Sequence, residues 1–351
     1  MSASARLRVA VAAPLAPELC ELLVALEPRI ELLVDQELLP PMRHPADFAG
    51  DPSFARTPRQ QNAYESMLDG ADALYGIPDV DPVALARTVR TNPQLRWVQT
   101  MAAGGGGQVR AAALSDAELD RVVFTTSAGV HGEALAEFAV FGVFAGAKHL
   151  PRLMEQQRKR EWSGRWMMSQ LSAQTVLVLG LGGIGASVAA KLSALGATVI
   201  GTSRSGATAP GVSRTVHPDE VAEVLAHVDA VVTTLPGTDA THHLIGSDFL
   251  AALRPGATIV NVGRGTVVDE AALLDALDRG IVGFAALDVF EVEPLPEESP
   301  LWEHPRVLIS PHTAALTDLE DRRIAELFAE NATRFLDGAP LRNVVDTVEF
   351  Y

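Results

Sequence analysis

Short apolar runs recur along the second half of the chain, with helical patterns between most of them. The runs occupy residues 175–179, 198–201, 230–233, 258–262, 283–287 and 307–310. Apolar runs with little alternation, separated by helices, are typical of parallel strands whose sheet is covered on both faces. This half of the chain therefore predicts a doubly wound α/β domain.

The first part of the chain shows a similar pattern on a smaller scale. Apolar runs at residues 8–13, 30–34, 73–75 and 95–99 are separated by helical patterns. Residues 37–61 are rich in Pro, Arg and Asp, and we expect them to form a long surface loop, a kind of segment that is often functional. The pattern predicts a second α/β domain.

Two helical patterns connect these parts. Residues 133–162 predict one long helix, nearly all apolar over 135–147 and strongly basic over 152–160. A helix that is apolar on most sides must be buried, either in its own domain or against another subunit. The second pattern, an amphipathic helix over 318–336, follows the last strand, and we expect it to return to the first domain, which would then be discontinuous in sequence.

Composition narrows the choice of partners and compartment. Of 351 residues, 28 are Lys or Arg and 44 are Asp or Glu, giving a net charge of −16, which disfavours nucleic acid or an anionic membrane as the main partner. The single cysteine, Cys20, cannot form a disulfide framework or a Cys-rich zinc site. We expect a cytoplasmic protein, because the start of the chain lacks a signal-type segment and the longest uncharged stretch, 166–190, is too polar to span a bilayer.

A glycine motif follows the first strand of the second domain. It reads Gly180-Leu-Gly182-Gly183-Ile184-Gly185 and is followed by a helical pattern. In a G-x-G-x-x-G turn the glycines allow a tight turn, close approach to a pyrophosphate, and close packing of helix on strand. The flanking strand and helix favour a dinucleotide site over the alternative, a glycine-rich turn that binds nothing.

The next strand predicts which dinucleotide binds. An NAD-binding unit usually carries an acid here for the ribose 2′-hydroxyl, but this chain has Ser203, Arg204 and Ser205. An arginine can pair with a 2′-phosphate, and the two serines can donate hydrogen bonds to it. We therefore expect NADP(H), with NAD(H) as the alternative if Arg204 is simply solvated.

Three later strands end in residues suited to chemistry: Arg264, Glu293 and His312. Ligands of open α/β sheets bind beyond the carboxyl ends of the strands, so these side chains should meet at the edge that carries the glycine loop. Other interpretations stay open: Arg264 as a loop residue, Glu293 as part of a solvated acidic stretch, and His242 or His243, which also follow a strand, in the role of His312.

Taken together, the motifs resemble the D-isomer-specific 2-hydroxyacid dehydrogenase family. Order and spacing agree from about Leu95 to Asp346, whereas the N-terminal part is much less distinctive. The matching segments are residues 180–185, 235–238 with Thr241, 261–265 with 268–270, 287–296, 300–302 and 310–312.

The resemblance implies a fold and a set of roles. The fold is a Rossmann-type dinucleotide-binding domain (133–316) inserted in a smaller flavodoxin-like substrate domain (1–132 and 317–351). Arg264 would hold the substrate carboxylate and carbonyl oxygen, helped by the backbone of Ala103 and Gly104. His312 would protonate that oxygen, and Glu293 would favour the charged form of His312. Further cofactor contacts are expected at Leu235, Pro236, Thr241, Val262, Gly263 and Asp288, the last near the nicotinamide. A homodimer is also implied, and no metal is needed.

The leading hypothesis is an NADP(H)-dependent reductase of small 2-oxo acids, of the glyoxylate or hydroxypyruvate type. One alternative is an NAD-linked dehydrogenase of a larger acid such as phosphoglycerate, disfavoured by Arg204 and by a chain that ends at Tyr351 without a separate regulatory domain. Another is a cofactor-sensing protein without turnover, disfavoured by the intact Arg264, Glu293 and His312. The loop over 103–107 is richer in glycine than is usual in the family. The 37–61 loop, with Arg43 and His44, is one place that could decide substrate side-chain preference; the alternative is that both residues are simply solvated.

Overall fold

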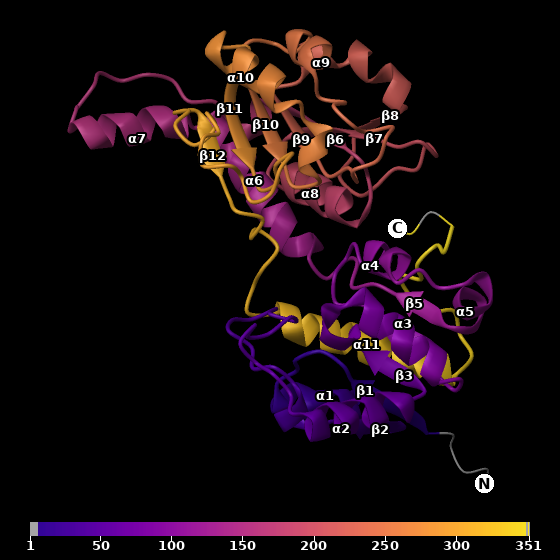
Figure 1. Cartoon of the computed structure of the whole chain (residues 1–351). Coiled ribbons are helices and arrows are strands. Elements are labelled where there is room, and N and C mark those ends of the chain that lie inside the picture. Colours follow the sequence, from indigo (N-terminus) through magenta and orange to yellow (C-terminus); the bar gives the residue numbers. More distant parts are fainter. Residues whose placement is uncertain (1–5, 349, 351) are drawn as a thin grey trace. The chain divides into compact units, whose positions relative to one another are not determined.

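The computed structural model describes residues 6–348 and 350, and these form two compact units (Figure 1). One unit combines the chain up to His131 with the segment that starts at Leu316, and the other holds Gly132–Ala315. The ends of the predicted first domain, residues 1–5, 349 and 351, lie outside the described residues.

The first unit is built on a five-stranded parallel sheet in the order β2-β1-β3-β4-β5. Its strands are β1 (Leu7–Val11), β2 (Ile30–Leu33), β3 (Ala73–Tyr75), β4 (Trp97–Gln99) and β5 (Val123–Thr125). This is the flavodoxin-like strand order, so the predicted fold class of this unit is confirmed. The sequence pattern missed the last strand, β5.

Helices cover this sheet, and the last of them comes from the end of the chain. They are α1 (Pro17–Leu26), α2 (Pro58–Asp69), α3 (Pro82–Thr91), α4 (Gly106–Ala111), α5 (Asp116–Arg121) and α11 (Glu320–Leu336), with short 3₁₀ turns at Gln36–Leu38 and Pro78–Val80. Helix α11 packs against α1 and buries Phe328, whose ring lies 4.4 Å from that of Trp97. The predicted amphipathic helix thus belongs to the first unit.

The predicted loop over residues 37–61 is wrong at both ends. A 3₁₀ turn includes its first two residues, and α2 begins at Pro58. Thr57 and Gln60 form a capping box, in which the Gln60 N–H donates to Thr57 Oγ1 (3.3 Å) and the Thr57 N–H to Gln60 Oε1 (3.0 Å). With Pro58 at the first helical position, this cap starts the helix inside a polar stretch.

The second unit holds a seven-stranded parallel sheet in the order β12-β11-β10-β9-β6-β7-β8. Its strands are β6 (Thr175–Leu179), β7 (Thr198–Thr202), β8 (Arg214–Val216), β9 (Ala230–Thr233), β10 (Ala257–Asn261), β11 (Val282–Leu287) and β12 (Val307–Ile309). If β6 is counted as strand 1 and the sheet is read from β8, the order is 3-2-1-4-5-6, followed by β12 as a seventh strand at the edge. This is the Rossmann order, so the predicted fold class of this unit is confirmed. The sequence pattern missed β8.

The helices of this unit are α6 (Gly132–Ala147), α7 (Leu150–Lys159), α8 (Gly183–Ala194), α9 (Ser247–Ala251) and α10 (Glu270–Asp278). Short 3₁₀ turns lie at Leu171–Ala173, Pro218–Glu223, Leu225–His227 and Gly265–Val267. Helix α6 packs against α8, β10 and β11, and a Cβ added at Gly146 would lie 1.9 Å from Thr258 Oγ1. The apolar helix is therefore buried in its own unit along that face.

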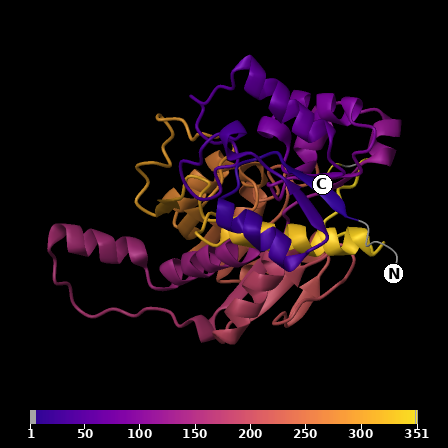
Figure 2. The ribbon, with the colours of Figure 1, turned by 90° about the horizontal axis from the view of Figure 1, so that it is seen from below.

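The prediction of one helix over 133–162 is wrong. Pro151 has no N–H and its ring would clash with the carbonyl of Ala147, so the helix cannot continue through it. The chain turns at His149, with φ 51°, and α7 follows, ending at Lys159. Figure 2 shows α7 and the segment after it running outward from the sheet of this unit. In the described part of the chain, no helix is long and apolar enough to cross a bilayer.

Candidate active site

Three neighbouring strands of the second unit end at one pocket. Arg264 follows β10, Glu293 follows β11 and His312 follows β12, and β12, β11 and β10 are adjacent in the sheet. All three side chains line a pocket of about 430 Å³, together with Gly237, Gly265, Thr266, Phe290 and Glu291. The structure therefore brings together the three residues that the strand ends predicted.

His312 and Glu293 form a hydrogen-bonded pair in this pocket. His312 Nδ1 lies 2.7 Å from Glu293 Oε2, and Glu293 Oε1 accepts the Phe290 N–H at 3.0 Å. Partial burial pushes the pKa of Glu293 upward, but the hydrogen bonds from His312 and Phe290 and the nearby charge of Arg264 outweigh it and hold that pKa below its ordinary value. Glu293 is therefore a carboxylate near neutral pH, and His312 Nε2 is left for another partner.

Asp288 holds the backbone that carries His312. The His312 N–H donates to the Asp288 carbonyl at 2.9 Å, and His312 has φ 52°, in the left-handed region. The buried Asp288 Oδ1 accepts the Ser310 hydroxyl and the N–H groups of Thr313 and Ala314, both at 3.0 Å. These contacts hold a strained turn in place. The sequence predicted Asp288 for the cofactor, and Ser310 was not predicted as a site residue.

The Arg264 turn is fixed from both sides. Asn261 donates to the Arg264 carbonyl and accepts the Gly263 N–H, each at 3.0 Å, and Arg264 Nη1 donates to the Gly263 carbonyl at 2.8 Å. A Cβ added at Gly265 would lie 1.9 Å from the backbone of Phe290. Only glycine therefore fits beside Arg264. Asn261 is a further residue that sequence reasoning did not single out, although an Asn two residues before a turn amide is a recognisable signal.

The two rival histidines lie outside the residues that line this pocket. The rings of His242 and His243 stack with centroids 4.0 Å apart. His243 Nε2 lies 3.2 Å from Glu291 Oε2, so this ring faces a different carboxylate from the one that His312 contacts.

The glycine loop has the shape that a pyrophosphate requires. Gly180 has φ +93°, and a Cβ added at Gly185 would lie 1.9 Å from the Gly180 carbonyl oxygen. At Gly182 and Gly183 an added Cβ would meet nothing within 4 Å, so the start of α8 faces open space. Ile184 lies in the first turn of α8, whose backbone N–H groups can bind an anion. This loop fits the diphosphate of a dinucleotide.

The segment after β7 fits a 2′-phosphate. Ser203 Oγ and Ser205 Oγ lie 3.2 Å apart, with Ser203 half-buried and Ser205 exposed. The exposed Arg204 has no ion-pair partner within residues 6–348 and 350. An acid that would accept from a ribose 2′-hydroxyl is absent from Ser203–Ser205. A guanidinium with two hydroxyl donors suits the 2′-phosphate of NADP(H) better than the ribose hydroxyls of NAD(H).

The remaining cofactor candidates lie on two adjacent turns. A Cβ added at Gly263 would lie 2.5 Å from the Leu235 carbonyl, so the turns after β9 and β10 are in contact. Thr241 donates to the Pro236 carbonyl at 2.6 Å and closes its own turn. Val262 is buried and its N–H donates to Thr233.

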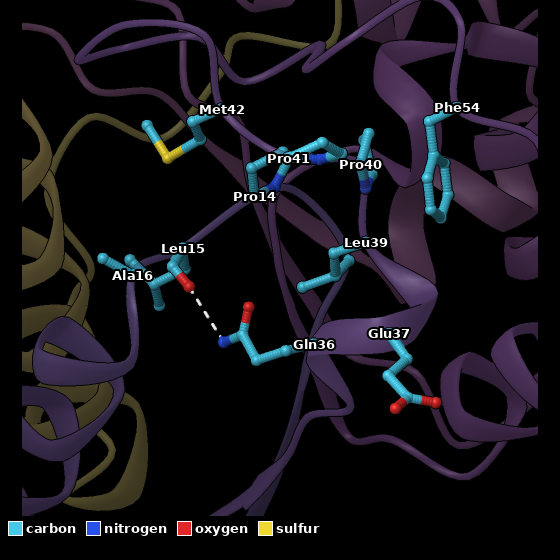
Figure 3. A pocket seen from close by; sticks show the side chains of 10 residues that line it. All are labelled: Pro14, Leu15, Ala16, Gln36, Glu37, Leu39, Pro40, Pro41, Met42 and Phe54. Atoms are coloured by element: carbon cyan, nitrogen blue, oxygen red, sulfur yellow. Dashed lines mark hydrogen bonds between the residues drawn. The ribbon is translucent and has the colours of Figure 1, made fainter.

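Ala103 and Gly104 lie in the first unit. They follow β4 and precede α4, at the carboxyl edge of the five-stranded sheet, and both are exposed. The same edge carries an apolar pocket of about 520 Å³, formed by the segments after β1 and β2 (Figure 3). Its lining residues are Pro14, Leu15, Ala16, Gln36, Glu37, Leu39, Pro40, Pro41, Met42 and Phe54.

A side chain just before the 37–61 segment helps to shape this pocket. Gln36 Nε2 donates to the Leu15 carbonyl at 3.0 Å and so joins the two segments (Figure 3). Arg43 Nε donates to Asp47 Oδ2 at 2.6 Å, and His44 Nδ1 lies 2.8 Å from the Pro45 carbonyl. Neither residue lines the pocket.

Comparison with known proteins places this site in a family. The model of the D-isomer specific 2-hydroxyacid dehydrogenase, NAD binding domain, matches residues 140–314. Glyoxylate/hydroxypyruvate reductase A of Salmonella choleraesuis is 40% identical over 177 residues, which are 50% of this chain and 56% of that relative.

Two solved structures resemble the chain over its whole length, each covering 99% of this chain and 100% of its own. A D-isomer specific 2-hydroxyacid dehydrogenase from Xanthobacter autotrophicus, in complex with NADPH and MES, is 30% identical with a TM-score of 0.77. An NADPH-dependent glyoxylate/hydroxypyruvate reductase from Sinorhizobium meliloti, in complex with NADP and sulfate, is 27% identical with a TM-score of 0.74. With this fold and these matches, the chain belongs to the D-isomer-specific 2-hydroxyacid dehydrogenase family of NAD(P)-dependent oxidoreductases.

Proposed function

We propose that this protein is an NADP(H)-dependent reductase of small 2-oxo acids, of the glyoxylate or hydroxypyruvate type. The observation that carries the proposal is the 2.7 Å contact between His312 and Glu293 in the same pocket as Arg264. A fixed cation and a proton donor are what a carbonyl group needs while it is reduced. The names of the Salmonella and Sinorhizobium relatives support the substrate class.

Arg264 binds the substrate in this proposal. Its guanidinium is planar and presents paired donors, which suit a carboxylate and the neighbouring carbonyl oxygen. The glycines on both sides pack closely against the backbones of Leu235 and Phe290, which fixes the turn that carries Arg264. The exposed backbone of Ala103 and Gly104 in the first unit is assigned a further substrate-binding role by the family resemblance, and the dinucleotide role belongs to the second unit.

His312 supplies the proton. NADPH, when bound, supplies the hydride, and the carbonyl oxygen then gains negative charge. The free Nε2 of His312 donates a proton to that oxygen, while Nδ1 stays bound to the Glu293 carboxylate, which orients the ring and favours its charged form. In the oxidative direction the same nitrogen accepts the proton.

The cofactor contacts follow the strand ends. The loop over Gly180–Gly185 and the start of α8 hold the diphosphate, and Ser203, Arg204 and Ser205 hold the 2′-phosphate. The turns that contain Leu235, Pro236, Thr241, Val262 and Gly263 line the nicotinamide side. Asp288 keeps the His312 loop in place beside them. The NADPH and NADP bound in the two solved relatives support this preference over NAD(H).

We also propose a homodimer formed through α6, α7 and the segment that follows. Trp162 and Met167 on this segment are 100% and 92% exposed, and Phe141 and Met154 on the two helices are exposed as well. Such a concentration of large apolar side chains is typical of an association surface. The single buried cysteine suits the proposed cytoplasmic location.

The test is a panel of 2-oxo acids assayed by the oxidation of NADPH and of NADH. We expect turnover of glyoxylate and hydroxypyruvate, with NADPH the better cofactor. Better catalytic efficiency with NADH by about tenfold, equal to about 1.4 kcal/mol, would refute the cofactor assignment. Preference for a larger acid such as phosphoglycerate would refute the substrate class, and activity on none would favour a cofactor-sensing protein.

A further inference from the structure

A second imidazole–carboxylate pair borders the Arg264 pocket. His243 Nε2 lies 3.2 Å from Glu291 Oε2, and Glu291 lines the pocket together with Arg264, Glu293 and His312. The two carboxylates are only two residues apart in sequence, so a single turn presents one to His312 and the other to His243.

The backbone around this second pair is fixed on both sides. Glu291 Oε1 accepts the Glu270 N–H at 2.9 Å, while Glu270 Oε1 accepts the Glu291 N–H at 2.8 Å. The His243 N–H donates to the Thr266 carbonyl at 2.8 Å, and Thr266 also lines the pocket. His243 therefore contacts two residues that line the pocket: its backbone N–H contacts Thr266, and its imidazole contacts Glu291.

His243 has a left-handed backbone conformation. Its φ is 52°, in the left-handed region that costs free energy for a residue other than glycine. Its Nε2 is buried and makes no hydrogen bond within the described residues, although the Glu291 carboxylate is 3.2 Å away. The contact is therefore one of charge rather than of hydrogen-bond geometry.

The charges around His243 are mostly negative. Asp269 Oδ2 lies 4.0 Å from His243 Nδ1, Glu291 faces Nε2, and Glu270 is bonded to the backbone of Glu291. The ring of His242, stacked 4.0 Å away, is the other titratable neighbour. With a neutral imidazole, Glu291 adds an uncompensated negative charge to the wall that Arg264 shares. A protonated imidazole offsets that charge.

We propose that His243 is a specificity-determining residue, which acts through Glu291 to set the charge of the Arg264 pocket and thereby the affinity for a small carboxylate. The inference rests on the proposed function, in which Arg264 binds the substrate carboxylate. A protonated imidazole offsets the charge of Glu291 and a neutral one does not, so one component of the affinity for anions decreases as the pH rises.

The experiment measures binding of oxalate, a planar anion that resembles a 2-oxo acid but cannot be reduced, to the NADP(H)-loaded protein at pH 6.0 and 8.5. The variant is His243→Asn, since Asn tolerates a positive φ. The matched control is His227→Asn, an exposed histidine just before β9, at the amino edge of the sheet. We expect His243→Asn to weaken binding about fivefold at pH 6.0 and little at pH 8.5, with the control unchanged at both.

Any other effect of pH on the pocket is shared by the wild type and the His243→Asn variant, so the ratio of their affinities isolates His243. An equal ratio at the two pH values would overturn the inference, because a merely structural role would not vary with pH. Glu291→Gln is the second variant: it should bind oxalate about threefold more tightly than the wild type at pH 8.5, and unchanged affinity would count against the proposal. Wild-type turnover of glyoxylate, measured separately, tests the proposed function by itself.

Discussion

At the scale of single residues, His312 is the side chain on which turnover depends most. Replacing it with Ala removes the proton donor while leaving the glycine loop intact. We expect turnover to fall by about 10²- to 10⁴-fold with NADPH affinity unchanged. The measurement is steady-state kinetics paired with NADPH titration. Near-normal turnover would move the role to His242 or His243.

Glu293 should act through His312 and not on the substrate itself. In Glu293→Gln the amide cannot offset an imidazolium, so the charged form of His312 loses its partner at 2.7 Å. The variant should lose turnover, and the high-pH limb of its profile for reduction should move to lower pH. A profile of unchanged shape at lower amplitude would contradict this role.

Glu320 gives a stability prediction that is separate from catalysis. Burial, with the nearby Asp321 carboxylate, raises the pKa of Glu320 from 4.5 to about 7. Between these values the folded chain holds a proton that the unfolded chain releases, so the folded state loses stability as the pH rises through this window.

Glu320→Gln should therefore stabilise the protein at pH 8 by roughly 3 kcal/mol and change little at pH 4.5. Thermal unfolding at both pH values is the measurement. Glu326→Gln, on the same helix but exposed and paired with Arg322, is the control. A stability gain of the same size at both pH values would show that the effect does not come from titration.

Residue identity alone predicted part of the site and left part out. Arg264, Glu293 and His312 could be predicted because each lies in the segment that follows a strand of one parallel sheet, and such segments meet at one edge. The anchoring of the His312 turn by Asp288, and the pairing of His243 with Glu291, depend on contacts between side chains 22 and 48 residues apart. A one-dimensional pattern carries no signal for such contacts.

At the scale of elements, two glycines of one loop should respond differently to the same change. Gly182→Ala places a Cβ in open space at the start of α8, so stability should stay unchanged while NADPH binds about tenfold more weakly. Gly185→Ala would place a Cβ 1.9 Å from the Gly180 carbonyl, so it should destabilise the fold itself, by about 1–3 kcal/mol or more. Equal effects on stability would contradict the assigned roles.

The segment after β7 should set the choice of cofactor. Arg204→Ala removes the proposed partner of the 2′-phosphate, so kcat/KM with NADPH should fall about tenfold while that with NADH stays nearly constant. Ser203→Asp adds the missing acid and should favour NADH further. An equal decrease in kcat/KM with both cofactors would show that Arg204 does not bind the 2′-phosphate.

Elements were predictable where the apolar pattern was long and the ends were marked. The strands from β6 to β12 follow that rule, except β8, whose three residues include Arg214 and Thr215. The break at His149 was missed because the apolar pattern of α6 outweighed the signal of Pro151. The start of α2 was missed because its cap, Thr57 with Gln60, lies inside a stretch that is polar throughout.

At the scale of the whole molecule, the segment that includes α7 makes the proposed assembly testable. Trp162 and Met167 are almost fully exposed in the single chain, so substituting them should cost little intrinsic stability. A dimer would have twice the mass of the 37.2 kDa chain in light scattering after gel filtration. The double variant Trp162→Glu, Met167→Glu should shift it toward the monomer, because buried carboxylates without partners are costly at an apolar interface. A dimer that survives this change would have to form through another face, and the exposed apolar residues of α6 and α7 would then need a different partner.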